Sequence, residues 1–170
     1  YTAAQSPNAH GFDEFFGLKS GYHDYYTHRG SNGRPDLWEN DRPTEATGYT
    51  TDLITARAVR FIEAQARGPF FLEVAYNAPH WPWETRADEA ESRRIERIIH
   101  TDGGSVATYL TMIRHMDEGI ARILDALFLI DDHGVAIDRH GPESRDFDLP
   151  LVDGLMAGPA QAERADRTKP

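Results

Sequence analysis

The chain of 170 residues contains no cysteine, fewer basic than acidic residues, and no long apolar run. Without cysteine it forms neither a disulfide nor a thiolate metal site, and it has no cysteine nucleophile. The formal net charge of −10 argues against nucleic acid or an anionic membrane surface as a partner. No stretch approaches the roughly 20 apolar residues of a membrane span, and residues 1–5 do not read as a signal peptide. We expect no nucleic-acid partner and no membrane segment, while compartment and oligomeric state stay open.

Two stretches have the periodicity of amphipathic helices. Thr50, Thr51 and Asp52 are N-cap candidates for a helix that ends at Arg67-Gly68, with a basic last turn and a C-terminal glycine. Its apolar residues are Ile54, Ala58, Phe61 and Ile62. A longer helix begins at Val106, capped by Gly103-Gly104-Ser105. Its predicted buried stripe comprises Tyr109, Leu110, Ile113, Met116, Ile120, Ile123, Leu124 and Leu127.

Residues 70–76 form an apolar run between the two helices and predict a strand buried on both faces, as in a parallel sheet. Ligands of such sheets bind beyond the carboxyl ends of the strands. His80 follows that end, in a loop stiffened by Pro79 and Pro82, and is the best candidate for a functional residue. Helix, strand, loop and helix together indicate an α/β fold.

The remaining segments are polar. Residues 1–43 are rich in Gly, Pro, Asn and Asp and predict an ordered, loop-rich part with one or two short strands. Residues 84–97 alternate acidic and basic side chains, which is typical of a solvated helix or loop. We expect one domain over residues 1–130 and a disordered tail over residues 131–170, because the tail has too little apolar surface to offset its ordering entropy.

Four groups of residues follow one another in the order of sequence landmarks that define a known family. They are His10-Gly11-Phe12-Asp13-Glu14-Phe15-Phe16-Gly17, Gly48-Tyr49-Thr50-Thr51-Asp52-Leu53, Pro69-Phe70-Phe71-Leu72 through Asn77-Ala78-Pro79-His80-Trp81-Pro82, and the helix around Met116-Asp117-Glu118-Gly119-Ile120. Over residues 7–127 the chain resembles the formylglycine-dependent sulfatases and looks like an incomplete internal segment of an arylsulfatase-like protein. Each landmark alone is weak, and their order carries the resemblance.

The resemblance implies a partial alkaline-phosphatase-like fold, with a sheet between helical layers, and hydrolysis of aryl or carbohydrate sulfate esters at a calcium site. In that family a formylglycine, made from a Cys/Ser-x-Pro-x-Arg motif, supplies the nucleophile. The position of His80 contacts a sulfate oxygen and helps the leaving alkoxide gain its proton, work that suits an imidazole. Members of the family are often exported or periplasmic.

The chain departs from the family at the nucleophile and the metal. No cysteine is present and no serine has the neighbours of the motif, so the formylglycine precursor is absent. Calcium ligands are not identifiable; Asp132 and His133 in Asp131-Asp132-His133-Gly134 have a passing likeness to a metal motif, against the alternative of a polar turn. We expect the segment to be inactive by itself. The alternatives are a phosphatase or phosphonate hydrolase of the same superfamily, or a non-catalytic remnant or interaction module.

Other polar residues near these landmarks have simpler interpretations. His23 and His28, among Tyr22, Tyr25 and Tyr26, either pack a loop, which we favour, or line the substrate mouth. Asn77 is expected to hold the loop by hydrogen bonding rather than to touch substrate. His10 is expected to belong to the turn of its landmark rather than to take part in chemistry. Structural or solvent-facing roles are expected for the remaining histidines, which have no partner at ligand spacing: His100, His115, His133 and His140.

Overall fold

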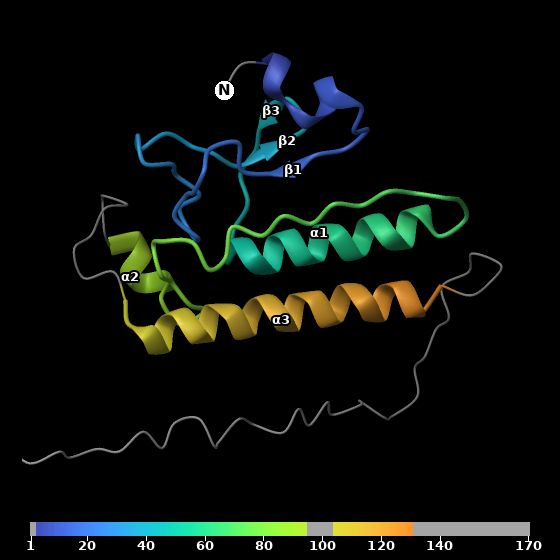
Figure 1. Cartoon of the computed structure of the whole chain (residues 1–170). Coiled ribbons are helices and arrows are strands. Elements are labelled where there is room, and N and C mark those ends of the chain that lie inside the picture. The colour runs from blue at the N-terminus through green and yellow to red at the C-terminus, as the bar shows by residue number, and fades with distance from the viewer. Residues whose placement is uncertain (1–2, 95–103, 131–170) are drawn as a thin grey trace, which may run out of the picture. The chain divides into compact units, whose positions relative to one another are not determined.

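The computed structural model describes residues 3–94 and 104–130, which all belong to the first of two units, residues 1–138 (Figure 1). The predictions for residues 131–170, including Asp132 and His133, lie outside the described residues. In chain order the elements are η1 (Ala3–Gln5), η2 (Pro7–His10), β1 (Phe16–Gly17), β2 (Trp38–Glu39), β3 (Arg42–Pro43), α1 (Thr50–Gln65), α2 (Glu89–Arg94) and α3 (Val106–Phe128). In the described part of the chain, no helix has both the length and the apolar character needed to cross a membrane.

α3 begins at Val106 as the sequence predicts, whereas α1 begins at Thr50, at least one residue before the start that the predicted N-caps Thr50, Thr51 and Asp52 imply. Tyr49 is the N-cap of α1, and Asp52 in the first turn suits the positive end of the helix dipole. The side chain of Ser105 accepts a hydrogen bond from Thr108 N at 3.2 Å, and Thr108 Oγ1 accepts one from Ser105 N at 3.3 Å. This reciprocal capping satisfies backbone donors that the first turn of α3 would otherwise leave unpaired.

α1 and α3 run side by side in the same direction (Figure 1). We call the buried residues Ala58, Ile62, Ile123 and Ala126 between them the helix cluster. The helices approach closely at Gly119, where an added Cβ would lie 2.5 Å from Thr55 Oγ1 and 2.7 Å from the Tyr76 hydroxyl. Thr55 and Tyr76 are hydrogen-bonded to each other at 2.7 Å, so a polar contact occupies the space that a side chain at position 119 would need.

The predicted buried stripe of α3 is wrong for half of its positions. The structure exposes Leu110, Ile120, Leu124 and Leu127 to between 39% and 46%, and it buries the residue directly before each of the last three. Its buried residues are Met112, His115, Gly119, Ile123 and Ala126. The sequence pattern misled because α3 has apolar residues on two faces, while small residues, which carry no strong hydropathy signal, line the face against α1.

Residues 70–76 do not form the predicted doubly buried strand. They run back along α1 as irregular chain (Figure 1), with Phe70, Leu72, Val74 and Tyr76 packed on the helix cluster. Phe71, Glu73 and Ala75 alternate with them and are exposed, Phe71 to 74%. This period of two is that of extended backbone covered on one face. A strand is defined by pairing, and among the described residues no strand pairs with this segment.

The first half of the chain folds into loops around a small sheet. β1, β2 and β3 form an antiparallel sheet in that order, with Phe16 opposite Glu39 and Trp38 opposite Pro43. The three strands are two residues long each, slightly more strand than predicted. Together with the helices they give the α/β architecture that the sequence indicates.

Candidate functional site

His80 is exposed at the end of the segment that returns along α1. Its backbone N–H donates to Asn77 O at 2.7 Å, and the peptide bonds Ala78–Pro79 and Trp81–Pro82 on either side are both cis. Its Nδ1 lies 2.7 Å from Trp81 O. A carbonyl oxygen only accepts, so Nδ1 carries the proton in this contact. Nε2 has no hydrogen-bond partner within residues 3–94 and 104–130, and it is therefore the ring atom available to a ligand.

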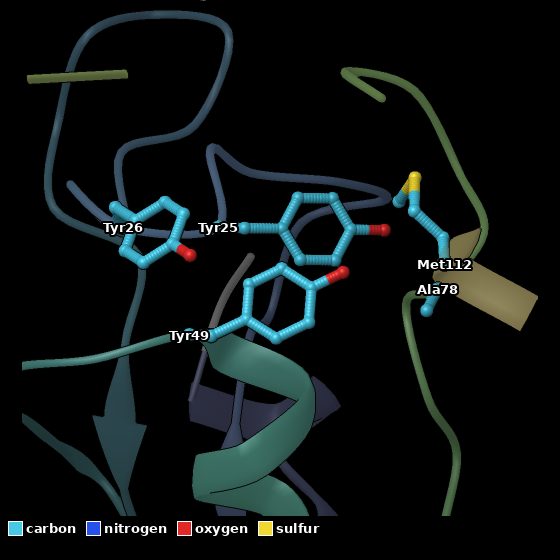
Figure 2. Packing of buried hydrophobic residues seen from close by; sticks show 5 residues of the cluster. All are labelled: Tyr25, Tyr26, Tyr49, Ala78 and Met112. Carbon is cyan, nitrogen blue, oxygen red and sulfur yellow. The ribbon is translucent and has the colours of Figure 1, made fainter. Parts of the chain in front are cut away.

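Three buried tyrosines anchor the backbone of the loop that carries His80. Tyr25, Tyr26 and Tyr49 pack with Ala78 and Met112 in what we call the tyrosine cluster, and the rings of Tyr25 and Tyr49 stack 5.2 Å apart (Figure 2). Their hydroxyls donate to three backbone carbonyls of residues 80–85: Tyr25 to His80 at 3.0 Å, Tyr49 to Glu84 at 2.8 Å and Tyr26 to Thr85 at 2.8 Å. Burial raises the pKa of all three hydroxyls, so they remain donors at any ordinary pH.

A fourth tyrosine lies against the imidazole itself. The ring of Tyr22 is stacked on that of His80, with centroids 4.9 Å apart and an interplanar angle of 11°, and it meets Trp81 edge-on at 6.0 Å. The run of tyrosines after Gly21 is thus used twice, once to anchor the backbone of the loop and once to contact the imidazole.

Glu84 is a buried carboxyl group that the sequence reasoning placed wrongly in a solvated charged segment. It is only 3% exposed, and its Oε2 accepts from Tyr25 N at 2.9 Å. Burial, reinforced by the neighbouring Asp24 carboxylate, raises the pKa of Glu84 to about 8. The signal that could have found it is the apolar Trp81-Pro82-Trp83 run directly before it.

Asp24 lies beside Glu84, and its pKa is shifted in the opposite direction. Its burial would raise the pKa, but hydrogen bonds from Thr27 N, Tyr26 N and the Ser92 hydroxyl outweigh this and keep the pKa of Asp24 below its ordinary value. Ser92, on α2, is also buried, so this part of residues 84–97 is less solvated than predicted. An ionised carboxylate and a protonated carboxyl group therefore meet beneath the His80 loop.

The other histidines near the site are structural, as favoured from the sequence. His23 is fully buried, with Nε2 2.9 Å from Thr50 Oγ1, and burial lowers its pKa to about 4. His28 is 5% exposed, its Nε2 donates to Gly48 O at 3.1 Å, and burial lowers its pKa as well. Neither ring is available to line a substrate mouth.

Asn77 does not hold the loop through its side chain as expected. Its carbonyl accepts the His80 N–H, but both side-chain polar atoms are buried without a hydrogen-bond partner in the described part of the chain. His115 is likewise buried, and its Nδ1 has no such partner. The backbone carbonyl of Asn77, rather than its side-chain carboxamide, supports His80.

The donor set of a calcium site is not found in the residues that the structure describes. Within residues 3–94 and 104–130, no group of three or more His, Cys, Asp or Glu side chains is arranged to hold a metal ion. The nucleophile motif is absent from the whole sequence. Among residues 3–94 and 104–130, the exposed and oriented imidazole of His80 is the candidate group for chemistry, and no step through calcium or formylglycine is assigned to these residues.

Comparison with known proteins identifies the class. The sulfatase family model matches residues 1–161, and the chain belongs to the sulfatase family. It is 29% identical over 123 residues to the uncharacterized sulfatase YdeN of Escherichia coli, covering 71% of this chain and 20% of that protein. It is 32% identical over 129 residues to arylsulfatase J of Mus musculus, covering 71% and 21% respectively.

Two further comparisons extend this result. The N-acetylglucosamine-6-O-sulfatase of Bacteroides thetaiotaomicron is 36% identical over 77 residues, which cover 43% of this chain and 12% of that protein. The crystal structure of Ps i-CgsB in complex with k-i-k-neocarrahexaose superposes with a TM-score of 0.58 at 29% identity, over 75% of this chain and 31% of the other. The predicted partial sulfatase fold is confirmed. The chain spans about a fifth of the length of the first two relatives.

Proposed function

We propose that this chain supplies the His80 loop of a sulfuric ester hydrolase and that His80 acts on the sulfate ester. The observation that carries the proposal is the exposed imidazole whose Nδ1 is bound to Trp81 O and whose Nε2 is open, in a sulfatase-family chain. The reaction class is hydrolysis of an aryl or carbohydrate sulfate ester to an alcohol and sulfate. Relatives named as an arylsulfatase and as an N-acetylglucosamine-6-O-sulfatase support both substrate classes.

In this proposal His80 works through Nε2. With Nδ1–H held by a backbone carbonyl, the protonated ring presents Nε2–H to a sulfate oxygen or to the bridging oxygen of the ester. As an oxygen nucleophile, in the net reaction water, bonds to sulfur and takes the sulfuryl group, the ester's sulfur–oxygen bond breaks. The leaving alkoxide takes the Nε2 proton and becomes the alcohol, and the imidazole is left neutral. A general acid so placed typically contributes a factor of about 10² to 10⁴ in rate. The proposal assigns no step to the nucleophile or the metal that the family uses.

The test uses an active sulfatase polypeptide that contains this chain. His80→Ala is expected to lower kcat for 4-nitrophenyl sulfate by about 10² to 10⁴-fold. His10→Ala, which removes another exposed histidine in the same half of the chain, serves as the matched control and keeps the activity. Equal turnover in the two variants would remove the assignment of His80.

The same preparation separates the proposal from its alternatives. Turnover of 4-nitrophenyl phosphate in preference to the sulfate would support a phosphatase of the same superfamily, because both esters present a tetrahedral anionic centre. The 170-residue chain alone is expected to be inactive. Calcium-dependent stabilisation together with sulfatase activity in that isolated chain would contradict this expectation and would also exclude a non-catalytic remnant.

A further inference from the structure

Tyr22 is the side chain that meets the face of the His80 ring. The two rings are nearly parallel, with an interplanar angle of 11° and a centroid distance of 4.9 Å. Such a stack is a packing contact with a defined geometry, since aromatic faces attract one another only in a few arrangements. Tyr22 is half-buried while His80 is exposed, so the tyrosine is the better fixed of the two rings.

The backbone of Tyr22 is anchored on both sides. Its carbonyl lies 2.9 Å from Ser20 Oγ, whose one hydroxyl hydrogen is shared between this carbonyl and the Asp36 carboxylate. The backbone N–H of Ser20 donates to the same carboxylate at 3.0 Å and fixes the residue there. The next residue, His23, is fully buried and bonded to Thr50 at the start of α1. The segment that carries Tyr22 is thus fixed to Asp36, two residues before β2, and to Thr50 at the start of α1.

The remaining contacts of His80 leave one rotation undetermined. Tyr25 holds the carbonyl of His80, and the Nδ1 bond to Trp81 O fixes which nitrogen carries the proton. The χ2 torsion of histidine is broad, however, and this hydrogen bond restricts the ring but still lets it tilt about the line from Nδ1 to Trp81 O. Stacking on Tyr22 supplies that second constraint.

We infer that Tyr22 is a positioning residue for the proposed sulfatase reaction, which fixes the plane of the His80 imidazole and hence the direction of Nε2. The inference rests on the proposed function of His80. Tyr22 contacts no substrate and transfers no proton in this inference. The face of its ring, rather than its hydroxyl, orients the imidazole. Loss of the face therefore affects the reaction, whereas loss of the hydroxyl does not.

The first test is spectroscopic and needs no activity. In the 170-residue chain, the ring protons of His80 should resonate upfield of those of an unstacked histidine because they lie over the Tyr22 ring, with His80→Gln used to assign the signals. Tyr22→Phe retains the upfield shift, and Tyr22→Leu, which fills similar space without a π-face, loses it. An unchanged His80 signal in Tyr22→Leu overturns the inference.

The second test uses an active sulfatase polypeptide containing this chain. Tyr22→Leu is expected to lower kcat for 4-nitrophenyl sulfate by about 10²-fold with KM nearly unchanged, as a misplaced catalytic group would. Tyr22→Phe restores the activity. If Tyr22→Leu loses the ring-proton shift but keeps kcat, or if Phe fails to rescue, positioning by Tyr22 is wrong.

The outcomes separate this inference from the proposed function. If His80→Ala keeps full turnover, the role of His80 fails and the inference fails with it. If His80→Ala is inactive while Tyr22→Leu is fully active, only the inference fails. Should Tyr22→Leu not fold, Tyr22→Met provides a flexible, non-aromatic replacement, and the same two measurements on it decide the question.

Discussion

The tyrosine cluster and the helix cluster lie in the same unit but are held together by different interactions. The helix cluster of Ala58, Ile62, Ile123 and Ala126 is aliphatic, and its attraction has no direction. In the tyrosine cluster each hydroxyl donates to a particular backbone carbonyl of residues 80–85. Hydrogen bonds fix distances and angles, which burial does not. The first cluster therefore stabilises the pair of helices, and the second determines where His80 lies.

The largest effect is expected from Ile62→Ala in the helix cluster. Ile62 is fully buried, and its truncation should lower the free energy of unfolding by about 2–5 kcal/mol, through lost burial and the cavity left behind. The His80 ring-proton signal of the folded variant stays in place, because the tyrosine cluster is intact. Chemical denaturation measures the loss. Ile120→Ala, at a 40% exposed position of α3, is the matched control, and an equal loss there would contradict the distinction.

A second, smaller effect follows from Glu84 beneath the tyrosine cluster. Its pKa of about 8 in the folded chain lies above the ordinary value of 4.5, so the folded state binds the extra proton between these values. The stability that Glu84 contributes is therefore complete at low pH and is lost as pH rises through about 8. Between pH 4.5 and 6.5 the buried His23 and His28, whose pKa values are lowered, act in the opposite direction.

The measurable window is therefore pH 6.5 to 8. Over it the free energy of unfolding should fall by about 2 kcal/mol, at about 1.4 kcal/mol per pH unit. Asp24 is the charged group that faces Glu84, and its ionisation is complete well below this range. Glu84→Gln keeps the shape and removes the titration, so its stability should be nearly flat from pH 6.5 to 8. Parallel curves for the two proteins would show that Glu84 is not the source.

The smallest effect on stability, and the most specific for the site, is expected from Tyr25→Phe. The variant keeps the buried ring and removes only the hydroxyl that donates to His80 O, which should cost about 1 kcal/mol. Unlike Ile62→Ala, it should also move the His80 backbone signals, as a heteronuclear NMR spectrum would record. Tyr109→Phe, whose ring packs on Trp83, is the control and leaves His80 unchanged. If both variants shift His80 equally, the directional role of Tyr25 is refuted.

The helices were predictable because their signals are local. The N-cap at Ser105 and the start of α1 at Thr50 depend on residues within a few positions of one another. The end of α1 was predicted less well, since the helix stops at Gln65, before the expected basic turn and glycine at Arg67-Gly68. The buried face of α3 was not predictable in the same way, since both faces are apolar and only the partner helix decides between them. The strand at residues 70–76 failed for a related reason: alternation can be read from the sequence, but pairing depends on a neighbour.

For the candidate site, the sequence predicted the loop and its histidine, and the structure adds the side chains around them. His80 was found because of Asn77-Ala78-Pro79-His80-Trp81-Pro82, and its proposed role still awaits its test. The stacking of Tyr22 and the burial of Glu84 join residues that are far apart in the chain. No periodicity or local motif announces such contacts, because they depend on how the loops fold over one another.

Gly119 has a consequence for how the folding chain chooses between alternative arrangements. Because α3 has apolar side chains on two faces, a rotation about its axis would bury the second face, which carries Leu110, Ile120, Leu124 and Leu127, in place of the first. Only one rotation brings the missing side chain opposite the Thr55–Tyr76 pair and lets that polar contact form without a clash. Gly119 therefore favours one packing arrangement of α1 and α3 over similar alternatives, and it contributes in this way to a unique native state.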